Sequence, residues 1–218
     1  LASDAYTPPA RLMRDPAIIR HSDGFYYVVY ATGADSAELG LTRSKDLKHW
    51  EFVRNVPIKV PAAAPAPIPL TAPEWLRDKD GSLKVLVSAA KGGAFVVTPN
   101  ADFSAWSAPQ PLEGLPDNYV DTAVVVTDGG YTALARNGAT GLIEMASAKS
   151  LLGPWTVDQQ GDWAKWGPTS GAHSLVRLAG GQWRLYFGAR LGRRAGDGAS
   201  GQSGQSASRP SARWYADS

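Results

Sequence analysis

The chain has 218 residues, a formal net charge of +2 and no cysteine. The near-neutral charge argues against a nucleic-acid partner, and the lack of thiols excludes a disulfide framework, a thiolate metal site and a cysteine nucleophile. No apolar run approaches the ~18 residues that a membrane span needs, so we expect no membrane partner.

Hydrophobic residues make up 44% of the chain, which includes eight Trp and eight Tyr. Aromatic side chains favour strands, and their flat rings can also form platforms for sugars. The length suits one all-β domain, which we predict over residues 1–218. The chain begins at Leu1 without a methionine, which indicates a processed or trimmed product. We expect a protein that is secreted or periplasmic. We also expect it to be a monomer.

Four segments share one pattern, in which a short turn containing glycine joins an apolar strand to a second apolar or aromatic strand. They are Ala17–Tyr30, Glu74–Val87, Thr122–Leu134 and Ser174–Phe187. Asp-Gly and Gly-Gly supply the positive φ angles that short hairpin turns need. The turn glycines are Gly24, Gly81, Gly129 and Gly180. Their spacing of 57, 48 and 51 residues is typical of propeller blades with four strands each.

A second motif recurs later in the first three repeats, where a polar turn leads to a tryptophan. It is found at Ser44–Trp50, Asn100–Trp106 and Ala148–Trp155. We interpret it as the turn before the outermost strand, with a structural tryptophan packed between blades.

Two segments fall outside the repeat. Residues 61–69 contain four prolines and predict an extended connector, because proline removes a donor and disfavours helix before it. Residues 191–210, rich in Gly and Ser, predict a flexible insertion. No amphipathic helix of ten or more residues is predicted. The fold class is therefore all-β, a β-propeller of four-stranded blades.

Three of the four repeats place an acid just before the innermost strand. Asp15 lies nine residues before its turn glycine, Glu74 seven and Asp121 eight, whereas the fourth repeat offers Gly171 and His173. Single carboxylates at strand starts are usually solvated. Innermost strands meet near the axis, however, and converging carboxylates raise one another's pKa values, as acid/base chemistry on a glycosidic bond requires.

At these positions the chain resembles the five-bladed propeller glycosidases of family 43, the arabinofuranosidase, xylosidase and arabinanase group. The resemblance covers about Arg14 to Phe187. It rests on Arg14–Ile19, Ser44–Leu47 with Trp50, Ala72–Trp75, Tyr119–Thr122 and Ser150–Trp155. It implies a propeller of the five-bladed type. Because only four repeats are present, we expect the C-terminal blade to be truncated or incomplete.

The resemblance also implies roles for the acids. In that family an Asp of the first blade is the general base, an Asp of the third blade orients the acid, and a Glu of the fourth blade protonates the leaving oxygen. Asp15 would be the base and Asp121 the modulator, while Glu74 would contact the substrate or support the site. The enzyme would invert the anomeric centre of an arabinofuranosyl- or xylosyl-containing plant-type polysaccharide or oligosaccharide, with the working carboxyls ~6.5–9.5 Å apart.

The fourth repeat departs from the family because Ser170–Val176 holds no glutamate, and none follows Glu144. Either a residue elsewhere takes the acid role, or the chain is a non-catalytic sugar-binding propeller. Gly171–His173 loosely resembles a family segment that points a His at the axis near a bound calcium. His173 is therefore a candidate for substrate binding or a structural calcium, or is a His hydrogen-bonded at a strand end. No cofactor is required otherwise.

Trp75 and Arg136 complete the candidate substrate-binding residues. Arg136 follows the inner strand of the third repeat, where it would pair with a substrate hydroxyl, pair with Asp121, or lie in a solvated loop. Glu144 stands in an alternating strand and is a distant candidate for the acid.

Two other propeller classes fit the sequence less well. A protein-interaction propeller would carry Gly-His and Trp-Asp signatures, which the repeats lack. A sialidase-type propeller has a repeat motif similar to Ser44-x-Asp46 with Trp50, but it also needs an arginine cluster and a Tyr nucleophile. The sequence does not place either of these.

Overall fold

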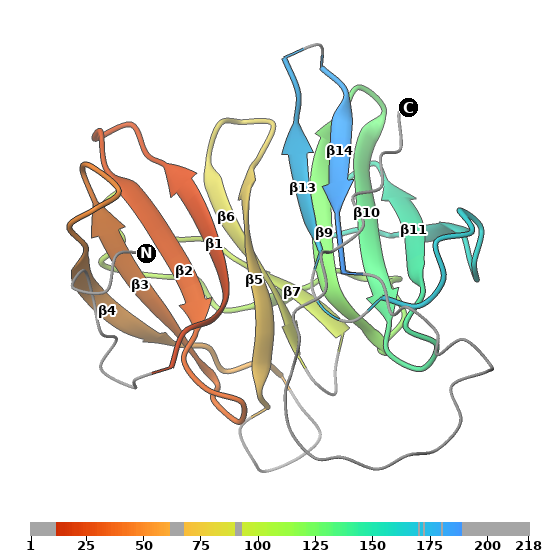
Figure 1. The fold of residues 1–218 in the computed structure, drawn as a ribbon, viewed down its shortest axis with the longest axis horizontal. Coiled ribbons are helices and arrows are strands. Elements are labelled where there is room, and N and C mark those ends of the chain that lie inside the picture. The colour runs from red at the N-terminus through yellow and green to blue at the C-terminus, as the bar shows by residue number, and fades with distance from the viewer. Residues whose placement is uncertain are drawn as a thin grey trace, which may run out of the picture.

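The computed structural model describes residues 12–61, 68–89, 93–169, 171, 173–179 and 181–188. These residues form three four-stranded antiparallel sheets and one two-stranded sheet (Figure 1). The predicted all-β propeller of four-stranded blades is confirmed. No described residue lies in a helix, so this part of the chain offers no helix that could cross a membrane. Residues 62–67 of the predicted connector and the predicted insertion at 191–210 lie outside the described residues.

Blade 1 is a sheet in the order β1-β2-β3-β4. Its strands are β1 (Arg14–Arg20), β2 (Tyr26–Ala31), β3 (Glu38–Ser44) and β4 (Glu51–Pro57). Gly40 on β3 pairs with Tyr30 on β2, and a Cβ added at Gly40 would come within 2.1 Å of the Tyr30 ring. Glycine is needed here because the fully buried Tyr30 ring lies against the backbone of β3.

Blades 2 and 3 repeat this arrangement. Blade 2 contains β5 (Leu70–Arg77), β6 (Leu83–Ala89), β7 (Gly93–Val97) and β8 (Gln110–Pro111). Blade 3 contains β9 (Tyr119–Thr127), β10 (Gly130–Asn137), β11 (Ile143–Ala148) and β12 (Thr156–Gln159). Blade 4 is described as the hairpin of β13 (Ser174–Arg177) and β14 (Trp183–Tyr186).

The first strand of each blade is the innermost. β1 contacts β5, β5 contacts β9, and β9 contacts β13, so the four strands follow one another around a common axis. Within the described residues β1 and β13 do not contact each other. The innermost strands therefore do not close into a ring within the described part of the chain.

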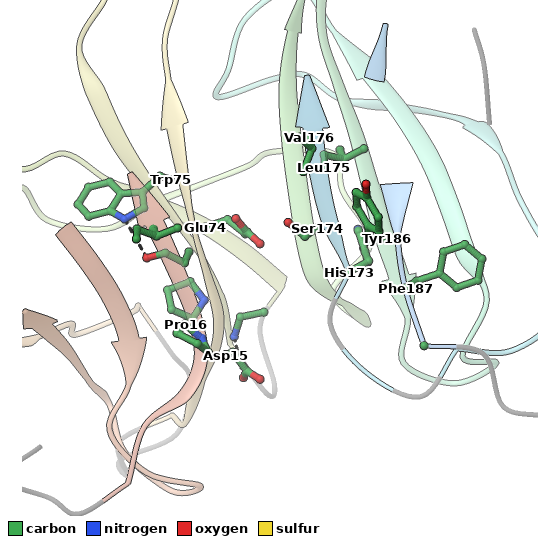
Figure 2. A pocket seen from close by; sticks show the side chains of 15 residues that line it. Asp15, Pro16, Glu74, Trp75, His173, Ser174, Leu175, Val176, Tyr186 and Phe187 are labelled. Atoms are coloured by element: carbon green, nitrogen blue, oxygen red, sulfur yellow. Dashed lines mark hydrogen bonds between the residues drawn. The ribbon is translucent and has the colours of Figure 1, made fainter. Parts of the chain in front are cut away.

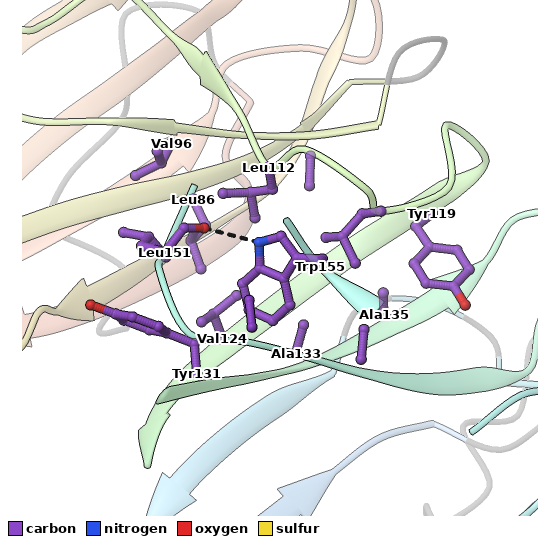
Figure 3. Close-up of a cluster of buried hydrophobic side chains, with 14 of the residues drawn as sticks. Leu86, Val96, Leu112, Tyr119, Val124, Tyr131, Ala133, Ala135, Leu151 and Trp155 are labelled. Atoms are coloured by element: carbon purple, nitrogen blue, oxygen red, sulfur yellow. Dashed lines mark hydrogen bonds between the residues drawn. The ribbon is translucent and has the colours of Figure 1, made fainter. Parts of the chain in front are cut away.

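Each pair of neighbouring blades encloses its own hydrophobic cluster. Trp155 lies at the centre of the cluster between blades 2 and 3, where its Nε1 donates a hydrogen bond to the Leu151 carbonyl at 2.9 Å (Figure 3). Trp106 packs against the cluster between blades 1 and 2. The inter-blade packing predicted for the motif tryptophans is thus confirmed for these two, whereas half-buried Trp50 belongs to neither cluster.

Candidate active site

A β-bulge interrupts each of the first three innermost strands at an equivalent position. In each strand two consecutive residues have no partner on the neighbouring strand. They are residues 15 and 16 in β1, 72 and 73 in β5, and 121 and 122 in β9. The bulged residues Asp15, Ala72 and Asp121 have φ angles of 49°, 46° and 54°. This is the left-handed region, which non-glycine residues seldom adopt. The bulge therefore sets three equivalent side chains at the same level near the axis.

This equivalence corrects the offset that the sequence predicted for Glu74. The blade 2 counterpart of Asp15 and Asp121 is Ala72, and Glu74 is instead equivalent to Ala17 and Ala123. The predicted common offset is wrong for Glu74, because Glu74 lies seven residues before its turn glycine whereas the bulged residue of blade 2, Ala72, lies nine before it.

The turn glycines explain why Asp121 was counted at eight residues before its turn and Asp15 at nine. Gly24 and Gly81 have the expected positive φ of 88° and 82°, and each lies nine residues after its bulged residue. In blade 3 the hairpin turns on two residues, and Gly130, at φ 146°, already pairs with Thr127. Asp121 lies nine residues before Gly130, as Asp15 lies nine before Gly24 and Ala72 nine before Gly81. This shared distance of nine residues is the sequence signal that would have identified the three bulged positions.

A pocket of about 680 Å³ opens between blades 1 and 2 on one side and the β13–β14 hairpin on the other (Figure 2). Asp15 and Glu74 line one wall, and His173, Ser174 and Tyr186 line the other. The described residues that line this pocket do not include Asp121. The structure therefore brings Asp15 and Glu74 together in one cavity and places Asp121 beside it.

Asp15 is held at the pocket by the neighbouring blade. Its Oδ2 accepts a hydrogen bond from the backbone N–H of Ala72 at 3.2 Å. The donor is the backbone of the equivalent bulge, so this contact aligns blade 1 with blade 2 and orients the Asp15 carboxylate.

Asp121 forms an ion pair within blade 3. Arg136 Nε donates to Asp121 Oδ2 at 2.7 Å, with side-chain exposures of 23% for Arg136 and 8% for Asp121. Of the roles expected for Arg136, the structure shows the pairing with Asp121. A carboxylate so deeply buried depends on this partner, because an unpaired buried charge is strongly destabilising.

His173 is buried between this ion pair and the pocket. Its Nε2 lies 2.8 Å from the Leu134 carbonyl, to which it donates, and its buried Nδ1 has no hydrogen-bond partner among the described residues. Burial lowers the pKa of His173, an effect that Arg136 reinforces and that the Leu134 carbonyl and Asp121 oppose. His173 is therefore a neutral imidazole whose Nδ1 can only accept a hydrogen bond.

The calcium expected near His173 stays a prediction. The part of the chain that the structure describes holds no group of three or more His, Asp or Glu side chains that could bind a metal ion.

Glu74 reaches into the pocket from β5 without a polar partner. It is half-buried, and within the described structure it makes no hydrogen bond or ion pair. Burial raises the pKa of Glu74 from its ordinary 4.5 to about 7. Glu74 also borders a second cavity of about 470 Å³ between β5, β9 and β13.

Trp75 is among the residues that line the pocket, and its ring points towards blade 1 (Figure 2). Its Nε1 donates to the Ala17 carbonyl at 3.2 Å, and its ring meets Phe103 edge-on at 5.9 Å. These contacts show packing between blades 1 and 2, not the open platform that sugar binding by Trp75 would require.

Glu144 is a structural carboxylate. It is buried and accepts hydrogen bonds from the Tyr119 hydroxyl, Asn137 Nδ2 and the Gly161 N–H. Since it lines neither of the two cavities described above, it is not placed to act as the acid.

No protein-family model matches the sequence, and no curated protein matches it significantly. Solved structures do match. A family 43 β-1,3-galactosidase with galactodeoxynojirimycin is 13% identical, with a TM-score of 0.61, over 80% of this chain and 66% of that one. An exo-β-1,3-galactanase from Phanerochaete chrysosporium with β-1,3-galactotriose is 14% identical, with a TM-score of 0.63, over 84% and 44%. An α-L-arabinofuranosidase from Clostridium thermocellum is 15% identical, with a TM-score of 0.61, over 82% and 62%.

At such low identity these likenesses show the fold alone. The chain spans 44–66% of the length of these three structures. Their specificities differ, whereas their architecture is common. The chain therefore has the β-propeller fold of the family 43 glycosidases.

Proposed function

We propose that this chain is a glycoside hydrolase domain that cleaves an O-glycosyl bond with inversion, with Asp15 as its general base. The observation that carries the proposal is the equivalence of Asp15 and Asp121, which the same left-handed bulge places near the axis in blades 1 and 3. The bulge is a feature of the repeat, since Ala72 adopts it as well, and what supports a functional role is that the other two bulged positions both carry a carboxylate.

The contacts of each acid suggest its part in the reaction. Asp15, oriented by the Ala72 N–H, would take a proton from the water that attacks the anomeric carbon. Asp121 is paired with Arg136, and this ion pair, which has no net charge, would fix the electrostatic environment of His173. Neutral His173, buried beside the Asp121–Arg136 pair, would support the wall of the pocket that faces Asp15.

For the substrate we propose an arabinofuranosyl or xylosyl linkage, as the sequence resemblance implies. The arabinofuranosidase among the structural neighbours supports the first of these, while two other neighbours act on β-1,3-linked galactose. A substrate panel should therefore hold the aryl α-L-arabinofuranoside, β-xyloside and β-galactoside, together with matching oligosaccharides.

The test compares wild-type protein with Asp15→Asn. We expect turnover to fall about 10²–10⁴-fold, since the amide keeps the shape but cannot accept the proton. Sugar binding measured by calorimetry should survive. Asp35→Asn is the matched control, because Asp35 is exposed in the same blade and lines neither cavity described above. NMR of the first product anomer reports whether the anomeric centre is inverted.

A sugar-binding propeller without catalysis is the second candidate. It is favoured by one observation, the lack of a glutamate near Gly171, where the fourth blade of the resembling family carries its acid. Binding without cleavage of any aryl glycoside would support this candidate. An Asp15→Asn variant as active as wild type would contradict the role of Asp15, and neither binding nor cleavage would contradict both candidates.

A further inference from the structure

Cleavage of a natural glycoside needs a proton donor for the leaving oxygen as well as a base. All five glutamates of the chain lie within the described residues. Four of them are absent from the pocket lining, namely Glu38, Glu51, Glu113 and Glu144. Glu51 pairs with Arg43 on the outer side of blade 1, and Glu144 has three hydrogen-bond donors of its own. This leaves Glu74.

We propose that Glu74, on blade 2, is the general acid of this site and protonates the leaving glycosidic oxygen. The inference rests on the proposed hydrolase function and names the donor that the fourth repeat lacks. It departs from the sequence expectation, in which Glu74 contacted the substrate or supported the site.

Asp15 and Glu74 lie close together on the inner strands of neighbouring blades. Asp15 Oδ2 lies 3.2 Å from the backbone nitrogen of Ala72, and Glu74 follows two residues later on the same strand. Both side chains lie on the wall that faces β13 and β14 (Figure 2). Inverting glycosidases separate their carboxyls by ~6.5–9.5 Å, which leaves room for the attacking water.

The surroundings of Glu74 raise its pKa from 4.5 to about 7, so that a fraction of its carboxyl groups carries a proton near neutral pH. Burial is the cause that raises its pKa to about 7, and no neighbouring charge opposes it. The other titratable and charged groups that line the same two cavities are Asp15, Arg77, Asp78, Asp128, His173, Arg177 and Tyr186. On the facing strand the equivalent position is Ser174, which is uncharged. A general acid works best with a pKa near the operating pH.

The proton balance of the step is complete. The bond from the anomeric carbon to the leaving oxygen breaks as the Glu74 carboxyl gives that oxygen its proton. Water forms the new bond to the anomeric carbon and gives a proton to the Asp15 carboxylate. Glu74 then regains a proton from solvent and Asp15 releases one, so no metal or redox partner is needed.

The experiment measures Glu74→Gln on aryl glycosides whose leaving groups differ in acidity and on the matching oligosaccharide. The amide cannot donate its proton to the leaving oxygen, so oligosaccharide turnover should fall about 10²–10⁴-fold. A dinitrophenyl glycoside needs little protonation and should be affected far less. The kcat of wild type should fall above about pH 7, and the variant should lose this alkaline limb. Glu113→Gln, an exposed loop position, is the matched control.

The possible outcomes separate the two proposals. The acid role would be overturned if Glu74→Gln slowed aryl and natural substrates equally, or if the variant kept the alkaline limb. The proposed hydrolase function would still stand in that case, provided that the wild-type protein cleaves the glycosides. A wild-type protein that cleaves no glycoside would overturn both. Thermal unfolding of each variant shows that a lost rate is not lost folding, and Glu74→Asp provides a second test because a shorter carboxylic acid should restore part of the oligosaccharide activity.

Discussion

The Asp15 carboxylate accepts a hydrogen bond from the backbone N–H of Ala72 at 3.2 Å, although 57 residues separate the two in the chain. Both occupy the same bulge in neighbouring blades, and both precede a proline. The contact joins the mouth of blade 1 to that of blade 2, so the geometry of the candidate base depends on the backbone of the adjacent blade.

Replacement of Ala72 by glycine should stabilise the protein. Ala72 has φ 46°, a conformation that costs a residue with a Cβ about 1–2 kcal/mol and glycine almost nothing, while the added freedom of the unfolded glycine chain offsets part of this gain. We expect the free energy of unfolding to rise by up to about 1 kcal/mol in urea titration. Ala123→Gly is the control, since Ala123 is as buried as Ala72 but lacks the positive φ, so loss of its methyl group should only destabilise. Equal destabilisation by both changes would argue against the bulge.

Gly40→Ala should destabilise blade 1. The new Cβ would stand 2.1 Å from the buried Tyr30 ring, so strands β2 and β3 would have to move apart. Overpacking of this kind costs about 1–3 kcal/mol, which a denaturant melt resolves. Gly129→Ala should have little effect, because no atom lies within 4 Å of its added Cβ. Equal free energies of unfolding for the two variants would show that the Tyr30 ring does not lie against Gly40.

Arg136→Met should leave the Asp121 carboxylate buried without its partner. We expect a loss of about 3 kcal/mol in the free energy of unfolding, and partial recovery when Asp121→Asn is added. The comparison is Arg43→Met, whose pair with Glu51 is 39% and 63% exposed and should contribute less than about 1 kcal/mol. A double variant less stable than Arg136→Met alone would show that the pair does not carry the effect.

The protonation of Glu74 should be visible in stability as a function of pH. Between pH 4.5 and about 7 the folded protein holds a proton at Glu74 that the unfolded chain has released, so stability falls as pH rises through this window. Glu74→Gln removes this dependence. Its stability relative to wild type should be unchanged near pH 4.5 and higher by on the order of 2 kcal/mol at pH 8. A constant difference across urea titrations at both pH values would contradict the raised pKa.

The sequence by itself determined the strands, the hairpin turns and the blade period. Glycines such as Gly24 and Gly81 mark turns through their own φ preferences, and the apolar runs beside them predict strands whatever lies around them. Asp15 and Asp121 could be placed at the inner ends of strands for the same local reason.

Only the tertiary structure decided which side chains share the site. The bulge that makes Ala72, and not Glu74, the counterpart of Asp15 depends on cross-strand pairing, and the turn of the Trp75 ring depends on the Ala17 carbonyl 58 residues away. The burial that raises the pKa of Glu74 comes from neighbouring blades. These properties arise from contacts between blades, and no local pattern of residues encodes which distant backbone will supply them.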